Sequence, residues 1–587
     1  MTAILLFAMM APMQSIPAVT EDSVEQVRRT ARSAERNFER LARRLAPIKL
    51  GGSDGRSCDE IVGRFCLTYD SGRLPEPEPK PGPVIDARRD AIEALRHAFS
   101  YMPGDFETAA PLIRYLVEDG RAAEAVPAAR MFALVSGDTV WGPLLLGFAL
   151  HAAANDTAAA REFESGLGRI EKREADRIRD VEWLLGTRDR GRYDDLVERG
   201  RVAFEEQLWA MADPLYLTAG NERRNEHIAR HVWSRILART PFVSDMVRWG
   251  SDLEQLTVRY GISAARTRSP AWGLHEGSLT EHYDPDQLAY VPESLLTRGH
   301  PPTPLPDDPW ELGETRSRSG YAPVTVSRLR FLPHQVSRFP TASGAILRVD
   351  GMFRPDSQVP GAPTRTTIQI PVHTGLFVLR DGIDPVGEKR ERRIRTADTL
   401  PFWFEIELPM GEMLYSLEAI EDSTLRAGRA RYIVTIDSSS VLRVSDPVIL
   451  APTRGAAAPA TRQDPSFQPT ADLRFEPYDT IGIYAEISGL GGPGASFEVQ
   501  VSVEKASRAS LPARVANWLG DRLGLTSPSG PPRLRWTAVG NPAGEGRIAV
   551  DLALDGLDDG AHVILLQVTD PASATTTASR RVIVVKS

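Results

Sequence analysis

Apolar residues recur with a helical period in the first half of the chain and alternate with polar residues in the second half. In residues 23–46 the apolar positions follow steps of three and four: Val24, Val27, Ala31, Ala34, Phe38, Leu41 and Leu45. This spacing predicts a helix with one apolar face. Ser23 and Gln26 form a capping box at its start, and Pro47 ends it. A helical pattern resumes at Ile85 and continues to about residue 210. From Val324 onward, a period of two predicts β-strands.

Two stretches of the helical half resemble one another at an offset of about 35 residues. Residues 116–132 and 151–167 each contain a helical segment, a short turn and an alanine-rich second helix. A period near 34 residues is typical of tetratricopeptide-like helical hairpins, and about three of them fit in this region. We therefore expect residues 85–204 to form tetratricopeptide-like hairpins.

The β half divides into two blocks of short alternating strands separated by turn residues. This pattern is typical of β-sandwiches. In the second block, Asp559-Gly560 precedes an apolar strand and suits an immunoglobulin-like hairpin. The arginine-rich run 388–395 is expected at a solvated hairpin tip.

Composition and charge narrow the class of protein. The 587 residues carry a net charge of −8, which argues against general nucleic-acid binding. The chain has no apolar run of the roughly 18 residues that a membrane span needs. Two cysteines exclude a disulfide-built scaffold and a four-cysteine zinc site.

The start of the chain favours export. Ile4–Met10 is an apolar run of signal-peptide type, and Ala18 is a possible cleavage point. In an oxidising compartment, Cys58 and Cys66 are close enough in sequence to form a disulfide. The alternatives are a short buried segment or a misplaced start codon for the apolar run, and two unrelated thiols for the cysteines.

The helix 23–46 also carries seven arginines outside its apolar face, diluted by Glu35 and Glu39. They indicate either docking to an acidic partner or anionic lipid, or a solvated face on a helix packed against the next domain.

A short motif lies in the middle of the chain. Trp249-Gly250-Ser251-Asp252, followed by Leu256 to Gly261, resembles the motif of the GWxTD-domain family, with Arg248 and Ser251 as departures from it. The motif residues are Trp249, Asp252, Tyr260 and Gly261. From the residues themselves, Trp249 is a large anchor, Asp252 can cap a turn, and residues 255–260 alternate as a strand that Gly261 ends.

The segment 208–236 is similar to the one that precedes this motif in the family. The resemblance implies an exported protein with a helical part, the motif and C-terminal β domains. It implies no established enzymatic activity.

The sharpest candidate for chemistry is the pair His227 and His231. A separation of four on a helix places both imidazoles on one face, as in zinc sites. A third ligand would come from elsewhere, and the nearest candidates are His275, Glu276 and His282. The alternative is a structural pair at the edge of the helix's apolar face. The charged residues of the same helix can form ion pairs with Asp213 or Asp252, or bind an acidic ligand: Glu222, Arg223, Arg224 and Arg230.

These features predict a multi-domain α + β protein. Its expected parts are a signal peptide (1–18), an N-terminal helix and cysteine loop (19–73), a Pro-rich linker (74–84), the helical hairpins (85–204), a GWxTD-like central mixed block (205–298), a linker (299–323), a β-sandwich (324–450), a linker (451–470) and an immunoglobulin-like β-sandwich (471–587).

We expect a non-catalytic scaffold or adaptor of the periplasm or the secreted fraction. It would bind envelope or secreted proteins, without nucleic acid, a transmembrane span or a cofactor. The expected partner surfaces are the concave face of residues 85–200 and the junction between the central block and the first sandwich. The alternative is a zinc-dependent hydrolase that uses His227 and His231.

Overall fold

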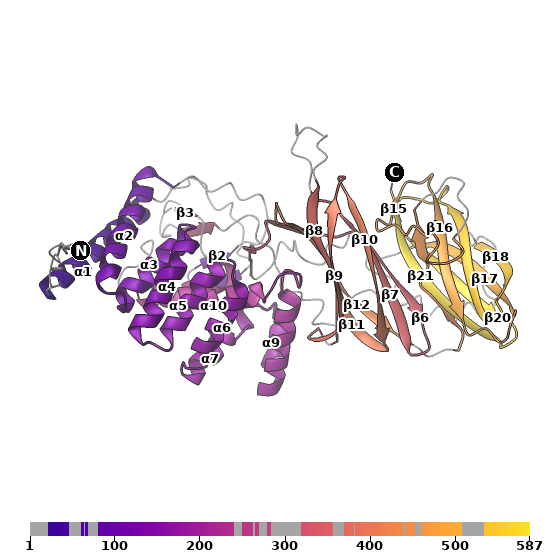
Figure 1. The fold of residues 1–587 in the computed structure, drawn as a ribbon, viewed down its shortest axis with the longest axis horizontal. Helices are drawn as coiled ribbons and strands as arrows, with labels where there is room; N and C mark the ends of the chain where they lie inside the picture. Colours follow the sequence, from indigo (N-terminus) through magenta and orange to yellow (C-terminus); the bar gives the residue numbers. More distant parts are fainter. Residues whose placement is uncertain are drawn as a thin grey trace, which may run out of the picture. The chain divides into compact units, whose positions relative to one another are not determined.

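The computed structural model describes residues 21–45, 60–63, 65–67, 80–239, 249–261, 265–268, 279–282, 319–355, 369–380, 382–437, 441–451, 459–506 and 533–586 (Figure 1). Helices fill the N-terminal region and several β-sheets the C-terminal region, as the two hydrophobic periods predict. The chain divides into two compact units. The described residues of 21–67, 80–179 and 227–282 form the first, and those of 180–226 and 319–586 form the second. No helix among the described residues is long and apolar enough to cross a membrane.

The first unit is mainly helical. Its elements are α1 (Glu21–Leu45), β1 (Glu60–Val62), β2 (Phe65–Leu67), α2 (Gly82–Tyr101), α3 (Phe106–Glu118), α4 (Ala122–Ser136), α5 (Trp141–Ala152), α6 (Asp156–Leu167), α7 (Lys172–Arg179), most of α10 (Glu222–Arg239), α11 (Ser251–Tyr260), β3 (Ala265–Arg268) and β4 (Leu279–His282). Helices α1 to α6 pack on one another in chain order. Small residues permit this packing: a Cβ on Gly147 of α5 would lie 2.6 Å from the Phe163 ring of α6.

The predicted helix 23–46 is confirmed as α1, and its apolar face joins the core of the first unit. Ala31 and Phe38 are buried there. Glu35 and Glu39 do not dilute the arginines on the outside of this helix, because both are buried against α3. Glu39 Oε1 accepts hydrogen bonds from Arg114 Nη2 at 2.7 Å and from the Tyr115 hydroxyl at 2.9 Å.

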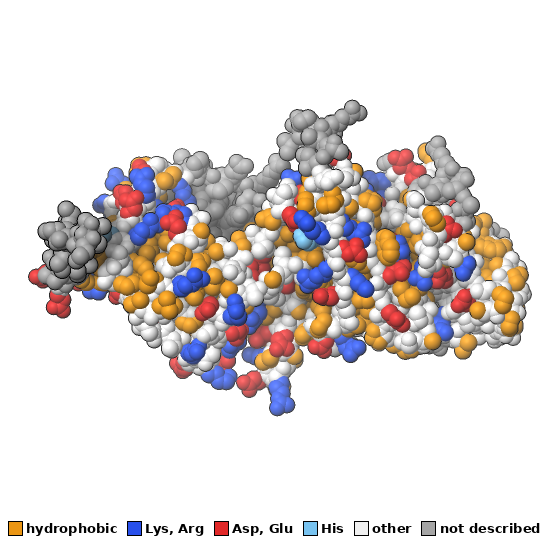
Figure 2. Space-filling model, in the orientation of Figure 1, with side chains coloured by type: hydrophobic (Ala, Val, Ile, Leu, Met, Phe, Trp, Pro, Cys, Tyr) orange, Lys and Arg blue, Asp and Glu red, His pale blue; other side chains and the backbone are white. Residues whose placement is uncertain are grey.

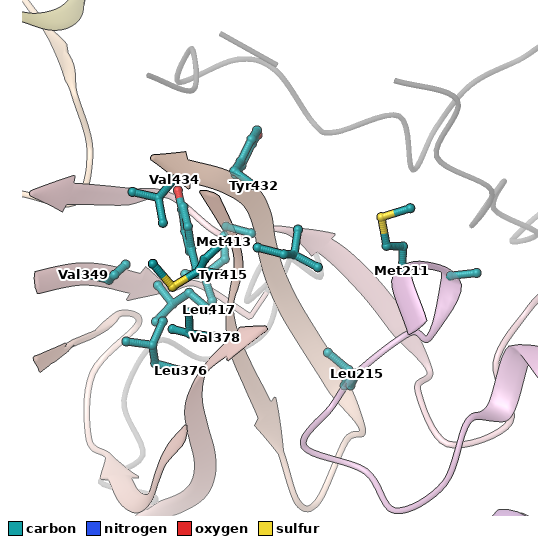
Figure 3. Close-up of a cluster of buried hydrophobic side chains, with 14 of the residues drawn as sticks. Met211, Leu215, Val349, Leu376, Val378, Met413, Tyr415, Leu417, Tyr432 and Val434 are labelled. Atoms are coloured by element: carbon teal, nitrogen blue, oxygen red, sulfur yellow. The ribbon is translucent and has the colours of Figure 1, made fainter. Parts of the chain in front are cut away.

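The second unit begins with η1 (Glu182–Leu184), α8 (Thr187–Asp194) and α9 (Glu198–Ala212). Its first two sheets contain β5 (Arg328–Phe331), β6 (His334–Pro340), β7 (Gly344–Phe353), β8 (Ile370–Arg380), β9 (Asp384–Arg395), β10 (Leu400–Pro409), β11 (Gly411–Glu421) and β12 (Arg426–Ile436). The strand orders are β10-β7-β6 and β5-β12-β11-β8-β9. Both sheets and α9 contribute to one hydrophobic core, which includes Met211, Val349 and Leu417 (Figure 3).

The remaining strands of the second unit form two further sheets. They are β13 (Arg443–Val444), β14 (Val448–Leu450), β15 (Arg474–Phe475), β16 (Thr480–Ser488), β17 (Ser496–Lys505), β18 (Arg533–Val539), β19 (Glu545–Ala553), β20 (Gly560–Asp570) and β21 (Thr575–Val585). One sheet has the order β13-β16-β14, with β19 paired to β16, and the other has the order β15-β21-β20-β17-β18. Residues 443–450 therefore pair with a strand of the last block.

Two local predictions were wrong. Residues 255–260 belong to helix α11 and not to a strand. Leu253, Leu256 and Tyr260 share one helical face, whereas Leu256, Val258 and Tyr260 alternate as in a strand, so the apolar residues of this segment fit both periods. The arginine-rich run 388–395 is not a hairpin tip, since it forms most of β9, the edge strand paired with β8. Exposed charges are typical of edge strands because they discourage pairing with other chains.

Charged side chains of both signs are interspersed over the face of the described residues seen in Figure 2. This arrangement matches the modest net charge of −8.

Candidate functional site

The motif residues lie at the start and along one side of α11. Gly250 is extended at the N-cap, with φ −163° and ψ 174°, and Asp252 and Glu254 occupy the first turn. Carboxylates in a first turn are favoured by the helix dipole. Trp249 and Tyr260 pack against a small cluster formed by α11 and the β1–β2 hairpin: Val62, Phe65, Leu253 and Leu256. The tryptophan is thus an anchor between α11 and the hairpin, as expected.

Asp252 faces the turn of that hairpin. Its Oδ1 accepts a hydrogen bond from the backbone N–H of Leu253 at 2.9 Å. Gly63 has φ +53°, and a Cβ there would lie 2.6 Å from Cβ of Asp252. The close approach of Asp252 to the turn therefore depends on a glycine at position 63.

Arg259 joins the C-terminal end of α11 to the same hairpin. Its guanidinium is fully buried and donates to both carboxylate oxygens of Glu60, at 3.1 and 2.8 Å. It also donates to the Tyr260 hydroxyl at 3.1 Å. Bidentate pairs of this kind are strong and directional. The residues involved are 199 positions apart, so sequence spacing gives no sign of the pair.

Arg230 of α10 caps the end of α11. Its Nη1 donates to the carbonyl oxygens of Val258 and Arg259, at 3.2 and 2.8 Å. Gly261 follows with φ +79° and ψ −149°, and a Cβ there would lie 3.0 Å from Arg230 Nε. Arg230 therefore binds backbone carbonyls of the motif, which the expected pairing with Asp213 or Asp252 did not anticipate.

His227 and His231 lie side by side on α10, as the spacing of four predicts. Their ring centroids are 4.7 Å apart and the rings are nearly perpendicular. Both are buried, and burial, the neighbouring His227 and the cations of Arg235 and Arg177 keep the pKa of His231 well below its usual value. Arg235 in turn forms ion pairs with Glu174 and, at 3.8 Å, with Glu254 of α11.

Five of the predicted site residues lie wholly or partly outside the described part of the chain. His275, Glu276 and Cys58 lie outside the described residues, and so do the side chains of His282 and Cys66. Within the described ranges, no group of three or more His, Cys, Asp or Glu side chains is arranged to hold a metal ion. The zinc hypothesis and the disulfide therefore stay predictions.

Sequence reasoning missed a buried polar cluster in the second unit. Arg431 Nη2 lies 2.9 Å from Glu418 Oε1, and both side chains are fully buried. Arg431 Nη1 donates to the carbonyls of Met211 and Asp213, and Arg429 Nη1 donates to those of Asp213 and Pro214. Glu418 Oε2 accepts from the N–H of Leu217 at 3.0 Å. These bonds hold the segment after α9 against strands β11 and β12.

Glu222, at the start of α10, is bound within the second unit. Its carboxylate accepts hydrogen bonds from the backbone N–H groups of Val324 and Thr325 and from the Thr325 hydroxyl. Arg223 lies 5.9 Å from the Trp209 ring and 5.6 Å from the Tyr321 ring, in the range of cation–π contacts. The charged residues that begin this helix thus have structural contacts of their own.

A groove opens where the segment after α9 meets β8, β9 and β11. We call it the β8–β9 groove; its volume is about 390 Å³ and it is lined by Leu217, Thr218, His373, Thr374, Arg390, Glu391, Arg392 and Ile420. His373 Nε2 and Arg392 Nη2 lie 3.0 and 3.6 Å from the Asp422 carboxylate. Gly375 keeps the groove close to the α9 segment, since a Cβ there would lie 3.0 Å from the Leu217 side chain. The groove lies in the expected junction between the central block and the first β block.

Comparisons with known proteins give no family assignment. No family model matches the chain, and no curated protein matches it. Among solved structures, a red sea bream transglutaminase shares 9% identity over 43% of this chain and 31% of its own, with a TM-score of 0.14. A Bacteroides uniformis β-glucuronidase shares 9% identity over 41% of this chain and 26% of its own, with a TM-score of 0.17. The chain thus spans about a third or less of the length of these structures, and the likeness carries no argument about function.

Proposed function

We propose that this chain is a non-catalytic scaffold or adaptor of the bacterial cell envelope, exported to the periplasm or beyond, and related to the GWxTD-domain proteins. In this proposal, tetratricopeptide-like hairpins and immunoglobulin-like β blocks bind envelope or secreted proteins. The partner surfaces are the concave face of the helices of residues 85–179 in the first unit and the β8–β9 groove in the second unit.

One observation carries the proposal: the polar residues of the motif and of the neighbouring helix α10 bind the protein's own backbone and side chains. Arg259 binds Glu60, and Arg230 binds the last carbonyls of α11. Asp252 bonds the N–H of Leu253 beside the hairpin turn. Such contacts hold α10, α11 and the hairpin together, and they favour a structural role for the motif.

The β8–β9 groove supports partner binding. Both charged and apolar side chains line it, among them Arg390, Glu391 and Ile420. It adjoins β9, whose outer edge pairs with no other described strand. The exposed charges of β9 discourage pairing with unselected chains, whereas an extended peptide of complementary charge can pair with the backbone of this edge.

The alternative function is a metal-dependent hydrolase. The adjacent buried imidazoles of His227 and His231 favour it, because a histidine must be neutral to bind a metal and the lowered pKa keeps His231 neutral. The cation of Arg235, whose Nη1 lies 3.4 Å from His231 Nδ1, opposes it by repelling a metal ion.

The two functions separate by metal content and by partners. The full chain is purified from envelope fractions after chemical crosslinking, and bound zinc is measured for the wild type, His227→Ala and the exposed control His97→Ala. The adaptor proposal expects a reproducible protein partner and no zinc at a stoichiometric level. Stoichiometric zinc that is lost only in His227→Ala would overturn it in favour of the hydrolase.

A further inference from the structure

We propose that the outward face of α1 is a docking surface for an anionic phospholipid membrane. The surface consists of five exposed arginines, which we call the arginine ridge: Arg29, Arg32, Arg36, Arg40 and Arg44. The inference is independent of the adaptor function, since it concerns a face that the motif, the groove and the histidine pair do not use.

The ridge follows from the helical period. At about 100° per residue, its arginines fall within an arc of about 120° on one side of α1. The only other positions in that arc between residues 29 and 44 are Ser33 and Arg43. At about 1.5 Å per residue, the ridge extends for about 22 Å without an acidic side chain.

The acidic residues of this part of the helix face the opposite way. Glu35 is 4% exposed and Glu39 is 8% exposed, and both lie against α3. Arg114 of α3 meets Glu39 at 2.7 Å and Glu118 at 2.7 Å, so a cation inside the protein balances these carboxylates. Glu25 is exposed about one turn before the start of the ridge, and its carboxylate lies 3.1 Å from Arg28 and 4.0 Å from Arg29, the first ridge residue. Between residues 29 and 44, the positive charge of α1 is therefore directed outward and its negative charge inward.

The apolar face of α1 is already occupied by the core of the first unit, where Ala31 and Phe38 are buried. The helix consequently cannot insert into a bilayer as an amphipathic anchor does, and it would bind through charge alone. A plane of anionic headgroups needs no more than that, because each arginine near such a surface adds roughly fivefold to binding.

Other polyanions fit the ridge less well. A protein interface needs a desolvated centre with aromatic or aliphatic anchors, and the arc holds only Arg and Ser. A nucleic acid is the less suitable partner because the net charge of −8 argues against general nucleic-acid binding. A flat anionic bilayer needs contact with the ridge alone.

The test is co-sedimentation of the full chain with vesicles. One set contains phosphatidylglycerol mixed with phosphatidylcholine, and the other contains phosphatidylcholine alone. The ridge variant is Arg36→Gln with Arg40→Gln, since glutamine keeps the helix propensity of arginine. The matched control is Arg130→Gln with Arg161→Gln, two exposed arginines on α4 and α6 of the same unit. Circular dichroism confirms that both variants fold.

We expect binding to the phosphatidylglycerol vesicles only, weakened roughly 25-fold in the ridge variant and much less in the control. Binding should disappear as salt rises from about 0.1 M to about 1 M, where the Debye length falls from about 10 Å to about 3 Å. Three results would overturn the proposal: a folded wild type that does not bind the anionic vesicles, an equal loss in ridge variant and control, or binding to polyglutamate or DNA in preference to the vesicles.

Discussion

The guanidinium of Arg338 donates two hydrogen bonds to the carboxylate of Asp446, from Nε to Oδ2 and from Nη2 to Oδ1, and both are 2.8 Å long. Arg338 is on β6 of the first β block, whereas Asp446 lies between β13 and β14, which pair with β16. Burial opposes ionisation of Asp446, but the charges and hydrogen bonds of Arg338, with Arg581 nearby, lower its pKa to about 2. The ion pair of Arg338 and Asp446 therefore connects the two β blocks of the second unit.

Breaking the ion pair of Arg338 and Asp446 should destabilise the second unit. Asp446→Asn leaves Arg338 and the buried Arg581 without their counter-charge, and loss of one partner of a buried ion pair costs about 3 kcal/mol or more. Urea denaturation measures the loss of stability, with unfolding of the β strands monitored by hydrogen–deuterium exchange. The control is Asp558→Asn, which removes the exposed pair with Lys505 and should cost less than about 1 kcal/mol. Equal effects of the two variants would show that the ion pair contributes little to the stability of the second unit.

The docking of α1 should weaken as the pH rises toward neutrality. Burial raises the pKa of Glu35 from 4.5 to about 7, because it outweighs the attraction of Arg114. Between these two values the unfolded chain is ionised at Glu35 while the folded chain holds the proton, so stability is lost with rising pH, by about 3 kcal/mol in total. Below about pH 4.5 the contribution is fully present.

Glu35→Gln should remove this pH dependence, since its carbonyl oxygen can still accept the hydrogen bond from Tyr115. Hydrogen–deuterium exchange of α1 peptides between about pH 5 and about pH 8 measures the slope, after correction for the intrinsic exchange rate. Glu25→Gln on the exposed side of the same helix is the control and should keep the wild-type slope. A wild type without any slope would contradict the raised pKa.

The second unit should show the opposite dependence. His334 is buried, its Nε2 lies 2.8 Å from the Tyr415 hydroxyl, and burial lowers its pKa from 6.5 to about 4. As the pH falls through this range, His334 binds a proton in the unfolded chain but stays neutral in the folded chain. We expect a loss of about 3 kcal/mol from this group between about pH 6.5 and about pH 4.

His334→Gln should reduce this loss of stability at acid pH, even if the substitution lowers the stability at neutral pH. Urea midpoints of the second unit at several pH values provide the measurement. His373→Gln, at a half-exposed histidine of β8, is the control. If His334→Gln loses as much stability at acid pH as the wild type, groups other than His334 cause the loss.

The end of α11 should tolerate no side chain at Gly261. Its φ of +79° and ψ of −149° lie in a region that only glycine adopts readily, and a Cβ would also press on Arg230. Gly261→Ala should cost about 2–3 kcal/mol in the first unit, measured by urea denaturation. Gly137→Ala is the matched control: its φ is +65° but a Cβ there meets nothing within 4 Å, and it should cost only about 1 kcal/mol.

Sequence pattern predicted the elements whose period is unambiguous. The steps of three and four in α1 have no strand interpretation, and the alternating runs of the β blocks have no helical one. The pattern failed at α11, where apolar residues fit both periods and contacts with the hairpin favour the helix. It also failed at β9, because a charged run reads as solvated whether or not its backbone pairs in a sheet.

Much of the candidate site could not be predicted, because it is made by contacts between distant segments. The pair of His227 and His231 was predictable, since one helix turn fixes it. The contact between Arg259 and Glu60 depends on tertiary packing, and the β8–β9 groove draws its lining from four separate segments. The inward direction of Glu35 and Glu39 depends on Arg114, which lies two helices further along the chain.

The adaptor proposal is tested most directly by site-specific photo-crosslinking in envelope fractions of the native cell. A photoreactive amino acid replaces Arg392, a lining residue of the β8–β9 groove, or Tyr478, which is 88% exposed in the last β block and serves as the control. The proposal predicts the same partner protein in repeated adducts at position 392 and its absence at position 478. A chain that forms no adduct at position 392, and that carries stoichiometric zinc lost in His227→Ala, would contradict it.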